Sequence, residues 1–149
     1  MTDLIVRVAV PEERQLLEAL MRRASLANPG DRDALLAHPE VIEVPLVQIE
    51  AGQVFVAERD GAILGFAALL DRDDGDIELD GLFVEPEHWR EGIGRALVEQ
   101  CAAIARNAGA TRLHVIGNLE AEGFYRRCGF ESIGPFETRF GPALEMTLR

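Results

Sequence analysis

Two glycines, Gly92 and Gly94, lie between a strand-like stretch, residues 76–84, and a stretch with helical periodicity. After the glycines, apolar residues recur at the spacing of one helix face, at Leu97, Cys101, Ile104, Ala105 and Ala108. A glycine loop between a strand and a helix aims backbone N–H groups and the positive end of the helix dipole at an anion. Glycine also lacks the Cβ that would hold the anion away from these amides. The sequence therefore predicts a phosphate-binding loop.

The residues around the glycines indicate which type of phosphate-binding loop the sequence contains. A dinucleotide-binding fingerprint has a third glycine where this chain has Leu97, and a P-loop needs a lysine, of which this chain has none. The run that does fit is Leu82-Phe83-Val84-Glu85-Pro86 followed by Arg90-Glu91-Gly92-Ile93-Gly94-Arg95-Ala96-Leu97. It closely resembles the acetyl-CoA signature of the GNAT superfamily of N-acyltransferases.

A second run carries the same resemblance. It contains Asn118, Ala121, the pair Phe124-Tyr125 and the pair Gly129-Phe130. In GNAT proteins an Asn, an Ala three residues later, an aromatic–Tyr pair and a Gly-Phe recur at this spacing. Two motifs in this order and separation are more specific than either alone, and on them the chain is identified as a member of the superfamily.

The resemblance implies acetyl-CoA as the acyl donor and no metal. In the family a backbone N–H of the fourth strand polarises the thioester carbonyl; the matching position is Leu82, with Val84 aligned for pairing with pantetheine. The implied cofactor-binding residues are Leu82, Phe83, Val84, Arg90, Glu91, Gly92, Ile93, Gly94, Arg95, Asn118 and Tyr125. Two positions depart from the family pattern. Trp89 replaces a usual Gln or Arg, and Glu91 places a negative charge where Lys, Arg or Gly is common.

Tyr125 is the only tyrosine and matches the general acid of the family. A phenol with a pKa of about 10 can return a proton to a leaving thiolate. The other interpretation is that the ring only holds a short helix on the sheet.

Two carboxylates are candidates for the general base. Glu78 and Asp80 alternate with apolar residues on the predicted central strand, so both side chains are expected on one face. Either one could receive the proton of the acceptor amine or bind its positive charge. The competing interpretation is that both are solvated strand residues.

The elements that position these residues follow from apolar runs and turn signals. Asp60-Gly61 between apolar runs predicts a β-hairpin, which the strand at 76–84 extends into an antiparallel meander. Four further strands are expected at residues 4–9, 111–116, 130–136 and 143–148. A helix is expected after Pro11, with an apolar face formed by Leu16, Leu17, Leu20 and Met21. Two short helices are also expected, one capped by Asp31 or Asp33 and one at residues 120–128. Residues 41–51 are ambiguous and partly extended.

The resulting order, β-α-α-β-β-β-α-β-α-β-β, predicts an α+β (mixed α/β) fold. It matches the GNAT fold, in which a central, mostly antiparallel twisted sheet of about seven strands is flanked by about four helices.

Composition indicates one globular domain, residues 1–149, with 48% hydrophobic and 28% charged residues. The net charge of −11 argues against nucleic-acid binding, which depends on Lys and Arg contacts to phosphate. No apolar run reaches the roughly 20 residues that span a bilayer, and residues 1–4 lack signal-peptide features. The distant Cys101 and Cys128 give no disulfide framework and fit a cytoplasmic location, and the cysteines and histidines show no metal-ligand spacing.

We therefore expect an acetyl-CoA-dependent N-acetyltransferase that acts on a primary amine of a small molecule or peptide. Direct attack by the amine is expected, because no cysteine occupies a motif position that could carry an acyl intermediate. A non-catalytic acyl-CoA sensor or partner domain on the same fold is the alternative, and another acyl group such as succinyl or propionyl stays open. The acceptor's walls are expected from the first two helices and residues 134–142. GNAT proteins often dimerise, so a homodimer is also open.

Overall fold

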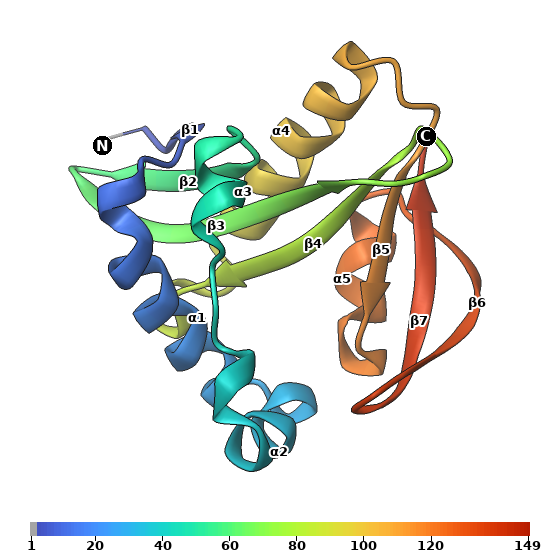
Figure 1. Cartoon of the computed structure of the whole chain (residues 1–149), viewed down its shortest axis with the longest axis horizontal. Coiled ribbons are helices and arrows are strands. Elements are labelled where there is room, and N and C mark those ends of the chain that lie inside the picture. Colours follow the sequence, from blue (N-terminus) through green and yellow to red (C-terminus); the bar gives the residue numbers. More distant parts are fainter. Residues whose placement is uncertain (1–2) are drawn as a thin grey trace.

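The computed structural model describes residues 3–149 and contains a seven-stranded sheet in the order β1-β2-β3-β4-β5-β7-β6 (Figure 1). The strands are β1 (Ile5–Val8), β2 (Val54–Arg59), β3 (Ala62–Asp71), β4 (Ile77–Val84), β5 (Leu113–Gly117), β6 (Glu131–Thr138) and β7 (Gly141–Leu148). The α-helices are α1 (Arg14–Ala27), α2 (Pro29–Ala37), α3 (Leu46–Glu50), α4 (Ile93–Asn107) and α5 (Glu122–Arg127). The α+β class and the seven strands are as predicted. Met1 and Thr2, within the segment expected to lack signal-peptide features, lie outside the described residues.

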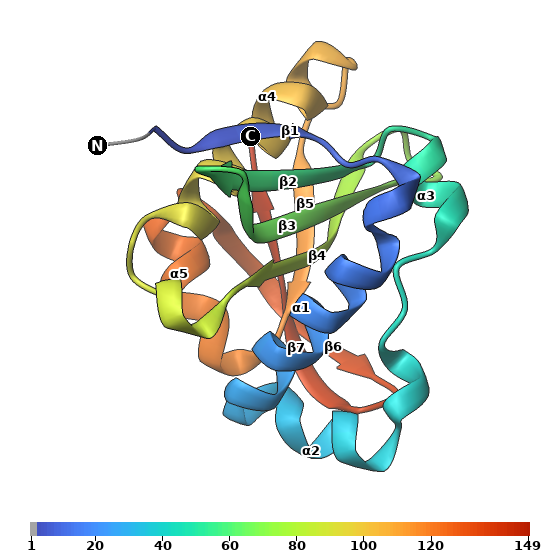
Figure 2. The ribbon, with the colours of Figure 1, turned by 90° about the vertical axis from the view of Figure 1, so that its left-hand side faces the viewer.

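The helices form layers on both faces of the sheet. Helices α4 and α5 pack on one face, and α1 and α3 pack on the other (Figures 1 and 2). On α4, Leu97, Cys101 and Ala105 are buried, which confirms the predicted apolar face except at Ala108, which is exposed and follows the helix. On α1, Leu17 and Leu20 are fully buried against the opposite face. None of the helices described within residues 3–149 is long and apolar enough to span a membrane.

The β2–β3 hairpin confirms the turn prediction. Asp60 and Gly61 have φ angles of 55° and 80°, the left-handed conformation that a tight two-residue hairpin turn requires at both positions. The three strands β2, β3 and β4 pair antiparallel, as expected for the meander.

One local prediction was wrong, and the ambiguous stretch 41–51 contains a helix. The second helix begins at Pro29, and its N-cap is Asn28, whose Oδ1 accepts the N–H of Gly30 at 2.9 Å, rather than Asp31 or Asp33. Proline is favoured at the first helical position because its missing N–H has no helical partner there. The stretch expected to be partly extended contains the one-turn helix α3, which raises the number of α-helices from about four to five. Its Ile49 is buried against the α1 side of the sheet, and that tertiary contact outweighs weak local preference.

A β-bulge at Asp80 changes which β4 side chains face α4. Ala68 on β3 is opposite Gly81, and the next residue of β3, Leu69, is opposite Leu79, so Asp80 has no partner. An extra residue in one strand shifts the alternation of side chains by one position. Leu79 before the bulge and Leu82 and Val84 after it therefore all contact the core cluster on the α4 side.

The bulge also coincides with the end of pairing between β4 and β5. These parallel strands pair only from Ile77 opposite Leu113 to Leu79 opposite Val115. Beyond Leu79 they diverge, as Figure 1 shows, and the second half of β4 keeps a paired neighbour only on its β3 side.

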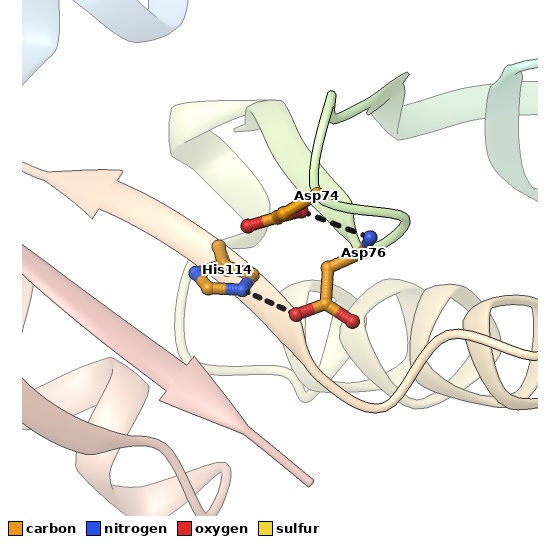
Figure 3. A group of neighbouring side chains, drawn as sticks. All are labelled: Asp74, Asp76 and His114. Atoms are coloured by element: carbon orange, nitrogen blue, oxygen red, sulfur yellow. Dashed lines mark hydrogen bonds and ion pairs between the residues drawn. The ribbon is translucent and has the colours of Figure 1, made fainter.

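Asp76 links the start of β4 to the start of β5, at the end where these two strands are paired. Its Oδ1 accepts the N–H groups of Thr111 at 2.9 Å and Arg112 at 3.1 Å. Its Oδ2 lies 3.0 Å from Nε2 of the buried His114 (Figure 3). The other ring nitrogen of His114 is 3.5 Å from a carboxylate oxygen of Glu145. These contacts, His114 first and the Arg112 N–H second, lower the pKa of Asp76.

Asp74, Asp76 and His114 are also the one group of potential metal ligands within residues 3–149, with ligand atoms within 4.8 Å of one another. Sequence spacing did not predict this grouping. The protein itself already engages these atoms, because Asp74 accepts the N–H of Asp76 at 3.0 Å and pairs with Arg72 at 3.2 Å. We therefore assign the group to fastening the β3–β4 turn onto the start of β5.

Replacing Asp76 by Asn should lower the free energy of unfolding at pH 7. The folded-state pKa of Asp76 lies below the unfolded value of about 3.9, so its contribution is present above that pH and is lost as the pH falls through the folded pKa. Urea unfolding of the wild type and Asp76→Asn should differ at neutral pH and converge in acid.

Asp73→Asn is the matched control, because Asp73 is an exposed carboxylate of the same turn. It should leave the unfolding curve unchanged. A stability loss in Asp76→Asn that is equally large at neutral and acid pH would contradict the assigned role.

Candidate functional site

A cleft of about 520 Å³ lies beside the unpaired half of β4. Nine of the predicted site residues line it, namely Leu82, Phe83, Val84, Arg90, Gly92, Ile93, Gly94, Arg95 and Tyr125. Four do not, namely Glu78, Asp80, Glu91 and Asn118. The structure thus brings the strand, the glycine loop and the tyrosine together into one concave site.

The first wall is the free edge of β4. The N–H of Glu85 bonds to the carbonyl of Leu64 on β3 at 2.8 Å. Because residues in an antiparallel ladder alternate in the direction of their N–H and C=O groups, those of Val84 and Leu82 point away from β3. With β5 no longer paired there, these groups face the cleft. An extended ligand can pair with them as a further strand would.

The second wall is the N-terminus of α4. Gly92 is the N-cap residue, with a φ of 86°, and its carbonyl accepts the N–H of Ala96 at 3.0 Å. The N–H groups before Ala96 in the first turn, including those of Ile93 and Gly94, have no carbonyl partner within the helix. Together with the helix dipole they form a site suited to an anion.

The two glycines serve different purposes. A Cβ on Gly92 would meet no atom within 4 Å, so this position needs glycine for its left-handed backbone. A Cβ on Gly94 would lie 3.1 Å from Cζ of Phe124 and 3.7 Å from a methyl group of Val84. Gly94 therefore allows α5 and β4 to pack closely on α4, a reason that the sequence did not reveal.

Trp89 and Glu91, the two residues that depart from the family pattern, differ in whether their side chains line the cleft. The indole Nε1 of Trp89 donates to the carbonyl of Val84 at 2.8 Å, so this side chain touches the β4 edge inside the cleft. The Glu91 side chain lies outside the cleft, where it pairs with His88 at 3.1 Å and Arg59 at 3.2 Å. These two partners, His88 first, lower the pKa of Glu91. The negative charge that the sequence placed in the loop is thus turned away from the anion site and neutralised.

Tyr125 is 8% exposed and is held by packing on both sides. Its ring lies edge-on to Phe124 and Phe130, with centroid distances of 5.2 and 5.4 Å. A Cβ on Gly117 would approach the tyrosine ring to 3.0 Å, so a glycine on β5 makes room for it. Burial, followed by the negative charges of neighbouring groups, raises the pKa of Tyr125, which keeps the phenol protonated at neutral pH.

The predicted bases lie outside the cleft. The Glu78 carboxylate pairs with Arg72 at 3.3 Å. Asp80 occupies the bulge, with its side chain exposed, although neighbouring protein atoms still desolvate the carboxylate enough to raise its pKa. The bulge changes the alternation only after Asp80, so it does not contradict the expectation that Glu78 and Asp80 share a face.

Asn118 holds an element rather than lining the cleft. Its Oδ1 accepts the N–H of Ala121 at 3.0 Å, and its Nδ2 donates to Oδ1 of Asp31 at 3.2 Å. Asp31 itself lines the cleft, together with Ala24 and Asn28 from the first two helices. The first two helices therefore contribute to the cleft, and Asp31 is a cleft residue that sequence reasoning missed. Only its position on the second helix, next to an expected acceptor wall, could have pointed to it.

Residues 134–142, the other expected acceptor wall, do not line the cleft. Their turn instead approaches the segment after α2, where Arg139 lies 3.9 Å from Glu40 and the rings of Phe140 and His38 are 5.4 Å apart. Cys128, by contrast, does line the cleft, so a thiol is present there although no motif position predicted one.

The comparison with known proteins identifies the family. Residues 14–130 match the Acetyltransferase (GNAT) family, and the chain belongs to it. An uncharacterized N-acetyltransferase of Mycobacterium tuberculosis is 34% identical over 91 residues, covering 59% of this chain and 58% of that protein. The match thus spans less than two thirds of that relative's length. An IAA acetyltransferase of Azospirillum brasilense is 31% identical over 137 residues, covering 86% of this chain and 82% of that protein.

Solved structures share the fold. The PaiA N-acetyltransferase of Thermoplasma acidophilum, in complex with coenzyme A, has a TM-score of 0.78 and 18% identity over 99% of both chains. YncA of Salmonella typhimurium, with its cofactor acetyl-CoA, has a TM-score of 0.73 and 21% identity over 99% of this chain and 94% of that chain. The predicted GNAT fold is confirmed.

Gly92→Ala should weaken CoA binding at least tenfold, or about 1.4 kcal/mol. Alanine disfavours the left-handed backbone that starts α4 and keeps its N–H groups turned toward the cleft. Isothermal titration calorimetry with CoA measures the effect.

Gly75→Ala is the matched control, because Gly75 has a φ of 87° and open space around its Cβ position but lies in the β3–β4 turn. It should show a comparable loss of stability and unchanged affinity. Equal affinities of the two folded variants would remove the α4 N-terminus from the binding site.

Filling the cleft should change the fluorescence of Trp89, the only tryptophan. The indole is 42% exposed and bonded to the β4 edge, so a ligand on that edge alters both its solvent contact and its hydrogen bond. CoA and dephospho-CoA, which share the diphosphate, should shift or quench the emission after correction for adenine absorbance, and pantetheine should have little effect. A flat signal on protein that binds CoA by calorimetry would place Trp89 away from the ligand.

Proposed function

We propose that the protein transfers an acetyl group from acetyl-CoA to a primary amine of a small molecule or peptide. The observation that carries the proposal is the single cleft in which the unpaired β4 edge meets the N-terminus of α4 and the hydroxyl-bearing ring of Tyr125. Family membership and the CoA-bound structures of the same fold support it.

The residues of the cleft fit the parts of acetyl-CoA. Backbone amides at the start of α4, with Arg90 and Arg95 beside them, suit the diphosphate. The N–H of Val84 suits an amide carbonyl of the pantetheine arm, whereas its C=O already accepts the indole N–H of Trp89. The N–H of Leu82 then polarises the thioester carbonyl, a contribution for which the loss of one donor typically costs about 10²–10³ in rate.

Tyr125 is proposed as the general acid that protonates the departing thiolate. Tyr125 lines the cleft, and its raised pKa keeps the proton on the phenol until a strong base forms beside it. Cys128 is not assigned a covalent role, because burial raises the pKa of its thiol and leaves it a poor nucleophile. Direct attack by the amine is therefore the proposed course.

Glu78 and Asp80 do not line the cleft, so we propose that these β4 carboxylates take up the acceptor's proton through water rather than by direct contact with the acceptor. The raised pKa of Asp80 suits proton uptake, and the pairing of Glu78 with Arg72 suits a positioning role. Both act from outside the cleft in this arrangement.

A panel of primary amines tests the function, with release of CoA followed by a thiol reagent. Amine-dependent release above the rate of hydrolysis is the expected result. Binding of acetyl-CoA without any amine-dependent release would instead support a sensor or partner domain. Acetyl-, propionyl- and succinyl-CoA compared with one amine identify the acyl group.

Tyr125→Phe should lower kcat by about 100-fold while leaving the affinity for acetyl-CoA nearly unchanged. The substitution removes the proton donor and keeps the ring packed against Phe124 and Phe130. Phe124→Leu is the comparison, since it disturbs that packing and keeps the hydroxyl. Wild-type kcat in a folded Tyr125→Phe variant would leave Tyr125 with a structural role only.

A further inference from the structure

The basic and the acidic side chains that line the cleft come from different elements. His88, Arg90, Arg95 and Arg127 supply positive or titratable nitrogen groups, and most of these belong to the loop and helix proposed to hold the diphosphate. Asp31 is the only carboxylate among the described residues that line the cleft. It comes from α2, on the side of the first two helices, and not from the loop that begins α4.

The position of Asp31 is fixed from the other side of the cleft. Asn118 donates to its Oδ1 at 3.2 Å, and Asn118 is itself fixed by the N–H of Ala121 at the start of the turn that leads into α5. The same turn and helix carry Tyr125, and the charge of Asp31 contributes to the raised pKa of that phenol. Carboxylate and phenol thus line the same cleft.

The carboxylate of Asp31 is not neutralised by the protein. No Arg or His forms an ion pair with it in the part of the chain from residue 3 to 149. Glu78, in contrast, is paired with Arg72. A partly buried carboxylate without a counter-ion, facing a ligand cleft, is suited to a cationic ligand group.

We propose that Asp31 binds the ammonium group of the acceptor and receives its proton, so that the acceptor is an amine that is cationic at neutral pH. The inference rests on the proposed acetyl transfer and adds to it the charge class of the acceptor and a residue on α2. Asn118, which orients the carboxylate without lining the cleft, is then a positioning residue.

The proton affinity of Asp31 fits this role. Burial raises its pKa, the nearby charge of Glu120 raises it further, and the hydrogen bond from Asn118 acts in the opposite direction. A carboxylate with a raised pKa is a better proton acceptor than a solvated one.

In the proposed reaction, each proton that is released has a group to receive it, and each group that is protonated has a donor. One N–H bond of the ammonium breaks, and its proton passes to the Asp31 carboxylate, which leaves a neutral amine. The amine nitrogen bonds to the thioester carbonyl carbon, the C–S bond breaks, and Tyr125 protonates the thiolate. The nitrogen returns a proton to the Tyr125 phenolate, and Asp31 releases its proton to water. The products are the acetamide, the thiol of CoA and a proton.

Two probe amines separate this role from a general loss of activity. 1,4-Diaminobutane is cationic at neutral pH, whereas 4-methoxyaniline is neutral and has no proton to lose before attack. Asp31→Asn keeps a group that accepts from Asn118 but removes the charge and the proton acceptor. It should lower kcat/KM for 1,4-diaminobutane by about 100-fold and leave transfer to 4-methoxyaniline and the affinity for CoA nearly unchanged.

Asp33→Asn is the matched control, because it removes the same charge from an exposed position of the same helix. It should leave transfer to both amines at the wild-type rate. Equal losses with both amines in Asp31→Asn, or no loss with the diamine, would overturn the proposal.

A binding measurement separates failure of this inference from failure of the acetyl transfer. CoA-saturated protein labelled with ¹³C in its aspartate carboxyl groups is titrated with 1,4-diaminobutane, and the Asp31 signal is assigned by its loss in Asp31→Asn. A saturable shift of that signal supports the ammonium site, even if the wild type releases CoA with neither amine and the proposed transfer fails for them. An unchanged signal overturns the inference whatever the turnover.

Discussion

The early separation of β4 from β5 determines where the cleft of this protein lies. The two strands pair for only three residues of each, and the extra residue Asp80 lies just beyond the last pair. A sheet interior normally satisfies every N–H and C=O on both sides, so an edge inside the sheet exposes unpaired groups to whatever enters. The cleft, the orientation of Leu82 and Val84, and the place of α4 beside them all depend on this edge. Asp76 and His114 fasten the closed end, which allows the open end to remain unpaired.

Features encoded by neighbouring residues could be predicted from the sequence. The Asp60-Gly61 turn needs two left-handed residues in succession, and its chemistry is visible in the dipeptide. The apolar face of α4 has a period that needs no tertiary information. The short helix α3 and the bulge at Asp80 could not be predicted in this way, because both depend on what packs across the sheet. The shift in alternation affects the residues after Asp80, since Leu82 and Val84 join Leu79 on the α4 side.

The residues proposed to hold the acyl donor could be predicted more completely than those proposed to bind the acceptor. The backbone amides of β4 and of the start of α4 belong to one continuous stretch of chain, with the glycine loop between them. A motif of consecutive residues is therefore enough to locate these amides. Asp31 enters the cleft through a contact with Asn118, 87 residues away in sequence, and no local pattern encodes that distance. The same holds for Glu91, whose charge is turned outward by Arg59 from the end of another strand. The residues proposed to recognise the acceptor could therefore be identified only from the three-dimensional structure.

The claim that the β4 edge and the α4 N-terminus together hold the acyl donor can be tested amide by amide. Two-dimensional ¹H–¹⁵N NMR of the labelled protein, titrated with CoA, reports on each backbone N–H group separately. The account predicts that the largest shifts and the strongest new protection from hydrogen exchange fall on Leu82, Val84, Ile93, Gly94 and Arg95, whereas amides of the β6–β7 hairpin stay unchanged. CoA binding that perturbs the α4 amides but leaves Leu82 and Val84 in free exchange, or that perturbs another surface, would contradict it.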